Sequence, residues 1–372
     1  MGSHVEDLAG TLRGSYPELD AVREATGEEP VYLVGGAVRD LLLGRGRSDL
    51  DLVVEGDAAA LAERLGGGHV SHERFATAKV RLDGHEVDIA AARAESYPHP
   101  GALPEVRPAR LGDDLARRDF TINAMAIPLR GEPELIDPRH GHADLEAGAL
   151  RVLHEDSFVD DPTRALRAAR YAARFGFLPE PRTEGLLREA DLGTVSEDRR
   201  EAELLRLAAE PDAPRAFELL AEWGLVEPRE GGVELAVRVS GLFSSPPWEE
   251  VAYRDRAVLV AALGPVGGEV ELANAAPERP SDAVELAREH GPVELVIARA
   301  MGAEWLDRYL DEWRSVELEI DGEDLIAAGI PQGPALGRGL REALRLKLDG
   351  EVAGRAQELE AALAAAREEE GG

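Results

Sequence analysis

Two aspartates stand two positions apart in a short segment that alternates polar and apolar residues. Asp49 and Asp51 therefore project from one face of an expected strand at 49–54, within reach of a shared hard cation. Paired carboxylates at this spacing suit Mg²⁺, and a solvent-facing acidic pair at a strand edge is the alternative. We predict that Asp49 and Asp51 are catalytic and ligate the metal.

A third aspartate and a pair of glycines extend this hypothesis. Asp88 lies on another expected strand, and its side chain points to the face opposite its apolar neighbours. It could complete a catalytic set with Asp49 and Asp51, and the alternative is that it caps the solvent face of a hairpin. Gly35 and Gly36 stand at an expected strand-to-helix turn, where backbone N–H groups hold phosphate. A phosphate cradle facing a metal pair indicates a two-metal site that activates a hydroxyl and stabilises leaving pyrophosphate.

The elements that must position these groups follow from the apolar pattern. We expect strands at 31–34, 49–54, 79–82 and 86–89, and helices at 37–43 and 57–65. The dipeptide Asp83–Gly84 favours a type I′ turn and hence an antiparallel pair. Residues 97–108 hold four prolines and one glycine, which predicts a mobile loop. From about 158 onward nearly all of the chain reads as helix.

Composition limits the class of protein. With 372 residues, 44% of them hydrophobic and 31% charged, the chain is expected to be globular with several domains. It has no cysteine, which excludes disulfides, thiolate catalysis and cysteine-ligated zinc. No apolar run approaches the roughly 18 residues of a membrane span, so we expect a cytoplasmic protein with no membrane segment. A net charge of -31 counts against a nucleic acid partner unless basic residues gather on one face.

Several ordered segments resemble the motifs of one family. They are Leu33–Gly44, Asp49–Asp51, Arg117–Ala126, Asp137–Leu145 and Asp160–Arg164, and with their neighbours they cover most of residues 31 to 205. They resemble the class II tRNA nucleotidyltransferases (CCA-adding enzymes) and the related bacterial poly(A) polymerases of the polymerase-β-like nucleotidyltransferase superfamily. Each motif alone is weak, whereas their common order is specific.

The resemblance implies a fold and a division into domains. The fold is an α+β head, a mixed or antiparallel sheet with flanking helices, followed by an all-α neck, body and tail. We expect a catalytic head at 1–150, a base-recognising neck at 151–215, a body at 216–310 and a tRNA-binding tail at 311–372.

The resemblance also assigns residues to the nucleotide. Near the triphosphate and ribose it places Gly35, Gly36, Arg39, Arg118, Asp119 and Asn123. On the residues alone, the Arg117–Asp119 segment is equally well a helix cap with exposed charges. An aspartate accepting from a 2′-hydroxyl is one way to favour ribonucleotides.

Asp161 and Arg164 are implied to form an amino-acid template for the incoming base. Cytosine and adenine present an amino donor beside a ring-nitrogen acceptor, whereas uracil and guanine present a carbonyl beside an N–H donor. A carboxylate and a guanidinium therefore accept C and A and reject U and G. The alternative for this segment is plain helix capping. Arg167 and Arg170 continue a basic helical stripe that either faces solvent or contacts the triphosphate and the tRNA end.

The implied reaction is template-independent transfer of CMP and AMP from CTP and ATP to the tRNA 3′ end, with Mg²⁺ as cofactor. The 97–114 stretch occupies the place of a flexible loop that tends to be shortened in CC-adding enzymes, and its near-full length favours A addition. The alternatives are an enzyme that adds only CC or only A, a poly(A) polymerase, and a catalytically inactive RNA-binding module. The sequence leaves the oligomeric state open, a monomer included.

Overall fold

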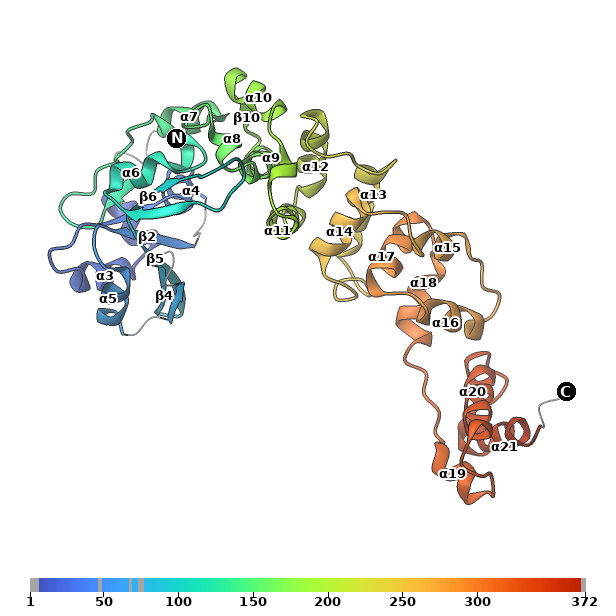
Figure 1. The fold of residues 1–372 in the computed structure, drawn as a ribbon. Helices are drawn as coiled ribbons and strands as arrows, with labels where there is room; N and C mark the ends of the chain where they lie inside the picture. The colour runs from blue at the N-terminus through green and yellow to red at the C-terminus, as the bar shows by residue number, and fades with distance from the viewer. Residues whose placement is uncertain (1–6, 46–48, 67–68, 73–76, 369–372) are drawn as a thin grey trace. The chain divides into compact units, whose positions relative to one another are not determined.

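The structure, a computed structural model, describes residues 7–45, 49–66 and 77–368 together with the backbone of 69–72. It divides into two compact units, Met1–Val226 and Glu227–Gly372. The first unit contains the sheet and its helices, and the second is helical (Figure 1). The expected α+β head followed by helices is therefore confirmed, while the finer boundaries at 150, 215 and 310 stay predictions.

A six-stranded mixed sheet forms the centre of the head. Its strand order is β3-β4-β5-β2-β1-β8, and β2 pairs with β5 in parallel while the other neighbours are antiparallel. The strands are β1 (Val31–Val34), β2 (Leu50–Val54), β3 (His69–His72), β4 (Thr77–Leu82), β5 (His85–Ala91) and β8 (Ala126–Pro128). The expected hairpin is confirmed, since Asp83 and Gly84 both have positive φ, 49° and 85°.

Helices flank this sheet and continue beyond it to Val226. Those of the head are α2 (Leu8–Ser15), α3 (Leu19–Ala25), α4 (Gly36–Leu42), α5 (Ala58–Arg64), α6 (Leu111–Ala116), the 3₁₀ turn η2 (Thr121–Asn123) and α7 (Gly141–Ala147). After them come β9 (Ala149–Leu150), α8 (Ser157–Asp160), α9 (Thr163–Phe175), β10 (Leu178–Pro179), α10 (Pro181–Arg188), η3 (Leu192–Thr194), α11 (Glu197–Ala208) and α12 (Ala213–Glu222).

The proline-rich segment differs from the prediction of an irregular mobile loop. Its last residues form β7 (Glu105–Pro108), which pairs antiparallel with β6 (Arg93–Ser96). The prolines are compatible with this because Pro108 ends its strand, where a missing N–H costs little. Residues 97–104 form the connecting loop, and this loop is attached to the helices that follow. Gly101 N donates to Val159 O at 3.1 Å.

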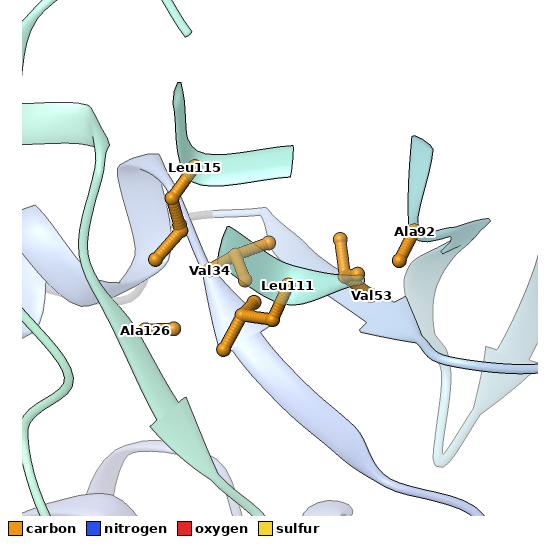
Figure 2. Close-up of a cluster of buried hydrophobic side chains, with 6 residues drawn as sticks. All are labelled: Val34, Val53, Ala92, Leu111, Leu115 and Ala126. Carbon is orange, nitrogen blue, oxygen red and sulfur yellow. The ribbon is translucent and has the colours of Figure 1, made fainter. Parts of the chain in front are cut away.

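A small apolar cluster fastens helix α6 to the sheet (Figure 2). Leu111 and Leu115 of α6 pack with Val34 of β1, Val53 of β2 and the residues Ala92 and Ala126. The two leucines are four positions apart, so both lie on one face of α6. Their burial fixes the helix whose C-terminal end leads into the Arg117–Asp119 segment.

The second unit has its own core. Its helices are α13 (Gly232–Leu242), α14 (Arg254–Leu263), α15 (Glu269–Asn274), α16 (Pro280–Arg288), α17 (Pro292–Met301), α18 (Trp305–Arg308), the π-helical η4 (Tyr309–Trp313), α19 (Gly322–Ala327), α20 (Pro334–Leu348) and α21 (Gly354–Arg367). Ala343 of α20 and Ala362 of α21 are fully buried in a cluster with Leu325 of α19. Across the described part of the chain, no helix has the length and apolarity that a bilayer crossing needs.

Replacing the α6 anchor tests this description. We expect Leu115→Ala to lower the free energy of unfolding of the head by about 2–5 kcal/mol, because Leu115 is 1% exposed and its loss leaves a cavity. Urea denaturation followed by circular dichroism at wavelengths sensitive to the sheet and helices measures the change. Leu103→Ala is the matched control, since Leu103 is 50% exposed. Equal stability of the two variants would contradict the anchoring role of α6.

Candidate active site

A row of charged side chains crosses three neighbouring strands of the sheet. Asp51 of β2 is in register with Asp88 of β5, and Asp88 is in register with Lys79 of β4. Asp49 directly precedes β2 and is exposed. Asp51, Lys79 and Asp88 line a cavity of about 270 Å³ together with Arg117 and Arg118. The structure thus brings the predicted carboxylates Asp51 and Asp88 to one side of the sheet.

Lys79 was not predicted in this site. Its Nζ lies 3.1 Å from an Asp88 carboxylate oxygen and 3.8 Å from one of Glu86. Asp88 therefore has a cationic partner on the neighbouring strand, whereas no ion pair of Asp51 is found among the described side chains. The two aspartates occupy different electrostatic surroundings in one cavity.

Burial raises the pKa of Asp51 to about 6, and the negative charges of Asp88 and Asp49 add to this effect against the opposing charge of Arg118. A cation bound beside Asp51 would stabilise the buried, ionised carboxylate. In the described residues no group of three or more His, Asp or Glu side chains is close enough to hold an ion alone. Magnesium sites of nucleotide enzymes commonly use one or two carboxylates plus substrate phosphates. The pair Asp49 and Asp51 fits that donor set.

Gly35 lies close to Asp51 and Arg118, two residues that line the cavity of about 270 Å³. It precedes α4 with a φ of 68°, and a Cβ there would lie 2.6 Å from Arg118 Nη1 and 3.8 Å from Asp51 Oδ2. A side chain would therefore both strain the backbone and displace Arg118. A Cβ on Gly36 would lie 3.4 Å from Arg39 Nη2. The two glycines permit close packing of arginines around the turn.

Arg39 is buried beneath the site, with 4% of its surface exposed. It donates to Asp40 and, at 2.7 Å, to Asn123 Oδ1, and its guanidinium lies 4.6 Å from the ring centroid of Phe175. Asn123 Nδ2 in turn donates to Asp119 Oδ1 at 2.9 Å. Arg39 thus binds Asn123, which in turn binds Asp119. A contact of Arg39 with phosphate stays a prediction.

Asp114 anchors both arginines of the Arg117–Asp119 segment. One of its oxygens accepts from Arg117 Nη2 at 2.7 Å and the other from Arg118 Nη2 at 3.0 Å. Burial alone would raise the pKa of Asp114, but the two guanidinium groups outweigh burial and hold the pKa below its usual range. Asp114 therefore remains ionised and fixes the wall of the cavity.

A second cavity, of about 390 Å³, shares this wall. This volume falls within the range of small-molecule sites. Five arginines and three acidic residues line it, so the cavity is locally basic within an acidic chain. Its lining residues are Arg93, Glu95, Tyr97, Pro104, Arg117, Arg118, Asp119, Asp161, Arg164 and Arg167. The predicted ribose and base residues thus meet in one cavity beside the carboxylates.

Arg167 connects the predicted ribose and base residues. Its Nε donates to Asp119 Oδ2 at 3.0 Å and its Nη2 donates to Asp161 Oδ2 at 3.2 Å. Burial raises the pKa of each aspartate, but the arginine charges outweigh burial and lower both values. The basic stripe is therefore not a solvated face at this position. Arg170 lies elsewhere, 4.0 Å from Glu210, and does not line the described cavity.

Arg164 is 2% exposed and held on several sides. Its Nη1 donates to Ser157 Oγ at 2.8 Å, and its Nη2 donates to the Arg117 carbonyl at 2.8 Å and to the Tyr97 hydroxyl at 3.4 Å. Its Nε is buried and has no hydrogen-bond partner among the described residues. An unpaired buried donor is costly, so an acceptor that reached this atom would stabilise the site.

Glu95, Tyr97 and Asp114 were missed by reasoning from sequence. Glu95 accepts from Arg93, Tyr97 and Arg117, each at 3.0 Å, and so joins β6 to the cavity wall. Asp114 had a readable signal, since it stands three and four positions before two arginines near a helix end. For Glu95 and Tyr97 the contacts that bring them into the cavity are with Arg117 and Arg164, 22 and 67 positions away, so no local pattern marks them.

The raised pKa of Asp51 predicts a stability effect with a definite sign. Without metal, Asp51→Asn is expected to stabilise the protein at about pH 7.5 by up to about 3 kcal/mol, because a buried charge is removed. The unchanged chain gains stability as the pH falls from about 6 to about 4 and Asp51 binds a proton, so the gap closes there.

Urea denaturation in EDTA across this pH range measures the gap. The exposed Asp113→Asn is the control and is expected to change stability by less than about 0.5 kcal/mol. An Asp51→Asn protein that is less stable at neutral pH would contradict the assigned surroundings of Asp51.

Comparison with known proteins shows which family this chain resembles. The family model described as "Poly A polymerase head domain" matches residues 31–151. An A-adding tRNA nucleotidyltransferase of Halalkalibacterium halodurans is 46% identical over 205 residues, which is 52% of this chain and 48% of that protein. The chain thus matches about half the length of this relative. A CC-adding tRNA nucleotidyltransferase of Deinococcus radiodurans is 36% identical over 349 residues, which is 90% of this chain and 88% of that protein.

Solved structures agree over nearly the whole chain. The Thermotoga maritima CCA-adding enzyme complexed with tRNA has a TM-score of 0.72 at 30% identity, covering 96% of this chain and 98% of that one. CCA-adding enzymes complexed with ATP and with CTP each have a TM-score of 0.76, at 31% and 30% identity, covering 96% and 97% of this chain and 98% of theirs. On this long match in sequence and fold, the chain belongs to the class II tRNA nucleotidyltransferase family.

Proposed function

We propose that this protein transfers CMP and AMP from CTP and ATP to the 3′ end of tRNA and releases pyrophosphate. The observation that carries the proposal is the junction of two cavities at Arg117 and Arg118. One cavity holds the carboxylates that suit a metal ion. The other gathers the side chains suited to a ribose and a base. A nucleotide that spans this junction places its α-phosphate beside Asp51.

Asp49 and Asp51 are the residues that would hold Mg²⁺. When bound, the metal would activate the tRNA 3′-hydroxyl and stabilise the leaving pyrophosphate. Arg118 lies against Gly35 and Asp51 and contributes positive charge beside the phosphates. Asp88, paired with Lys79, adds negative charge that keeps the site attractive to a cation. The 3′-hydroxyl attacks directly, and no covalent enzyme intermediate is required.

Carboxylate oxygens that can accept a further hydrogen bond indicate which atoms contact the ribose and the base. Each carboxylate oxygen accepts about two hydrogen bonds. Asp161 Oδ1 already accepts from Thr163 N, Thr163 Oγ1 and Arg199 Nη2, whereas Oδ2 accepts from Arg167 Nη2 alone among the described residues. We assign the base amino group to Asp161 Oδ2 and its ring nitrogen to Arg164 Nε. By the same reasoning Asp119 Oδ2 accepts from the ribose.

This assignment selects C and A without a nucleic acid template. Uracil and guanine would face Asp161 with a carbonyl oxygen and Arg164 with an N–H donor, which leaves two buried groups unsatisfied. The lowered pKa of Asp161 keeps it an acceptor at neutral pH. The guanidinium of Arg164 carries only hydrogen-bond donors.

The range of nucleotides added is the finer part of this proposal. Relatives of this chain are named for A addition and for CC addition, and its structural neighbours for CCA addition. The loop 97–104 and its hairpin are compatible with the full reaction. Addition of CC alone or of A alone, poly(A) synthesis and RNA binding without catalysis are the other outcomes of the test below.

Primer extension on tRNAs that end before CCA, after C and after CC tests the proposal. Each tRNA is incubated with Mg²⁺ and CTP, ATP or both, and the products are separated by length. We expect complete CCA addition to the shortest tRNA. Arrest after CC, or activity restricted to the CC-ended tRNA, identifies a partial enzyme. Long A tails on unrelated RNA indicate a poly(A) polymerase, and absence of incorporation with binding retained leaves an RNA-binding module.

A substitution in the template pair tests the reading of the base. Asp161→Asn replaces an acceptor-only group by one that also donates, so UTP is expected to gain relative to CTP by about tenfold or more. Single-turnover incorporation into the C-accepting tRNA measures the ratio. Asp160→Asn is the adjacent control, since the Asp160 side chain is 31% exposed and does not line the second cavity. An equal shift in both variants would count against Asp161 as the base reader.

A further inference from the structure

We propose that Arg199 is a positioning residue that sets base selectivity by holding the Asp161 carboxylate and the 97–104 loop in one arrangement. The proposal rests on the function above, in which Asp161 reads the base. Arg199 belongs to α11 and is not among the residues that line the second cavity. It contacts both a residue of that cavity and the loop.

The two ends of one guanidinium make the connection. Arg199 Nη1 donates to the Gly101 carbonyl at 2.8 Å, and Arg199 Nη2 donates to Asp161 Oδ1 at 3.0 Å. These contacts join residues 98 and 38 positions away from Arg199 in the sequence. The Asp161 oxygen that Arg199 holds is Oδ1, so Oδ2 remains directed to other donors. Together with Thr163 N and Thr163 Oγ1, Arg199 thereby occupies Oδ1 and leaves Oδ2 for a base.

The loop is docked closely at the same point. Gly101 has a φ of 69°, and a Cβ there would lie 2.5 Å from the Thr194 carbonyl oxygen. Gly101 N also donates to the Val159 carbonyl. At the start of the loop, the Tyr97 hydroxyl accepts from Arg164 Nη2. The loop is therefore connected to both residues that read the base. Tyr97 contacts Arg164 directly, and Gly101 is joined to Asp161 through Arg199.

The planar guanidinium group of Arg199 is what allows one side chain to contact both Asp161 and the loop. Arginine presents two Nη groups in fixed geometry, whereas lysine presents one nitrogen and keeps the charge. Arg199→Lys keeps the charge but loses the two separate Nη donors, so it weakens the contacts to Asp161 and to the Gly101 carbonyl. We therefore expect it to free the loop and to lower the preference for CTP over UTP while the fold and the net charge are preserved.

The experiment measures selectivity and loop motion together. Single-turnover incorporation of each of the four nucleotides gives the CTP/UTP ratio, which is expected to fall about tenfold in Arg199→Lys, as for the loss of a hydrogen bond between charged groups. The chain has no cysteine, so a nitroxide at Leu103→Cys reports on the loop, and its spectrum should sharpen in the same variant. Arg200→Lys on the same helix is the matched control.

A second variant approaches the bridge from the loop. Gly101→Ala forces the loop away from Thr194 and leaves Arg199 in place, so it should reproduce both changes if the loop and Asp161 are linked. Lost selectivity with an immobile loop, a mobile loop with unchanged selectivity, or wild-type behaviour in both folded variants would overturn the proposal. Failure of the unsubstituted chain to incorporate CTP would instead refute the proposed function.

Discussion

Buried pairing of arginine with aspartate is the interaction on which the rest of the site depends. Asp114 is fully buried and holds the two arginines that separate the cavities, and Arg167 holds Asp119 and Asp161 across one of them. Removing one partner of such a pair leaves an uncompensated charge, which costs about 3–5 kcal/mol. The site is therefore rigid where charges are matched, and its chemistry is expected at the atoms left unmatched.

Two such groups lie in the site. Burial raises the pKa of Asp51, and Arg164 Nε is a buried donor without a hydrogen-bond partner among the described residues. Both positions are next to the shared wall of Arg117 and Arg118. In a chain of net charge -31, the local excess of arginine at this wall offers a polyanion a favourable approach that the overall composition does not.

Much of the head could be predicted because its signals are local. The Asp83–Gly84 turn, the alternation around Asp51 and the glycines before α4 each depend on a few adjacent residues, and the strands and helices expected there are present. Other features are set by distant partners. The chain from Glu105 to Pro108 is a strand because β6 pairs with it, and Arg199 meets Asp161 across helices. No short-range pattern encodes these contacts.

The parallel pairing of β2 with β5 has a consequence for how the site forms. A parallel pair requires a long crossover, so Asp51 and Asp88 become neighbours only after the intervening chain, with α5 and the β4 hairpin, has taken its place. Contacts of such sequence separation form slowly, and here they also bring like charges together. The carboxylates that carry the chemistry therefore belong to the late-forming part of the head, and conditions that screen their charge should speed its folding.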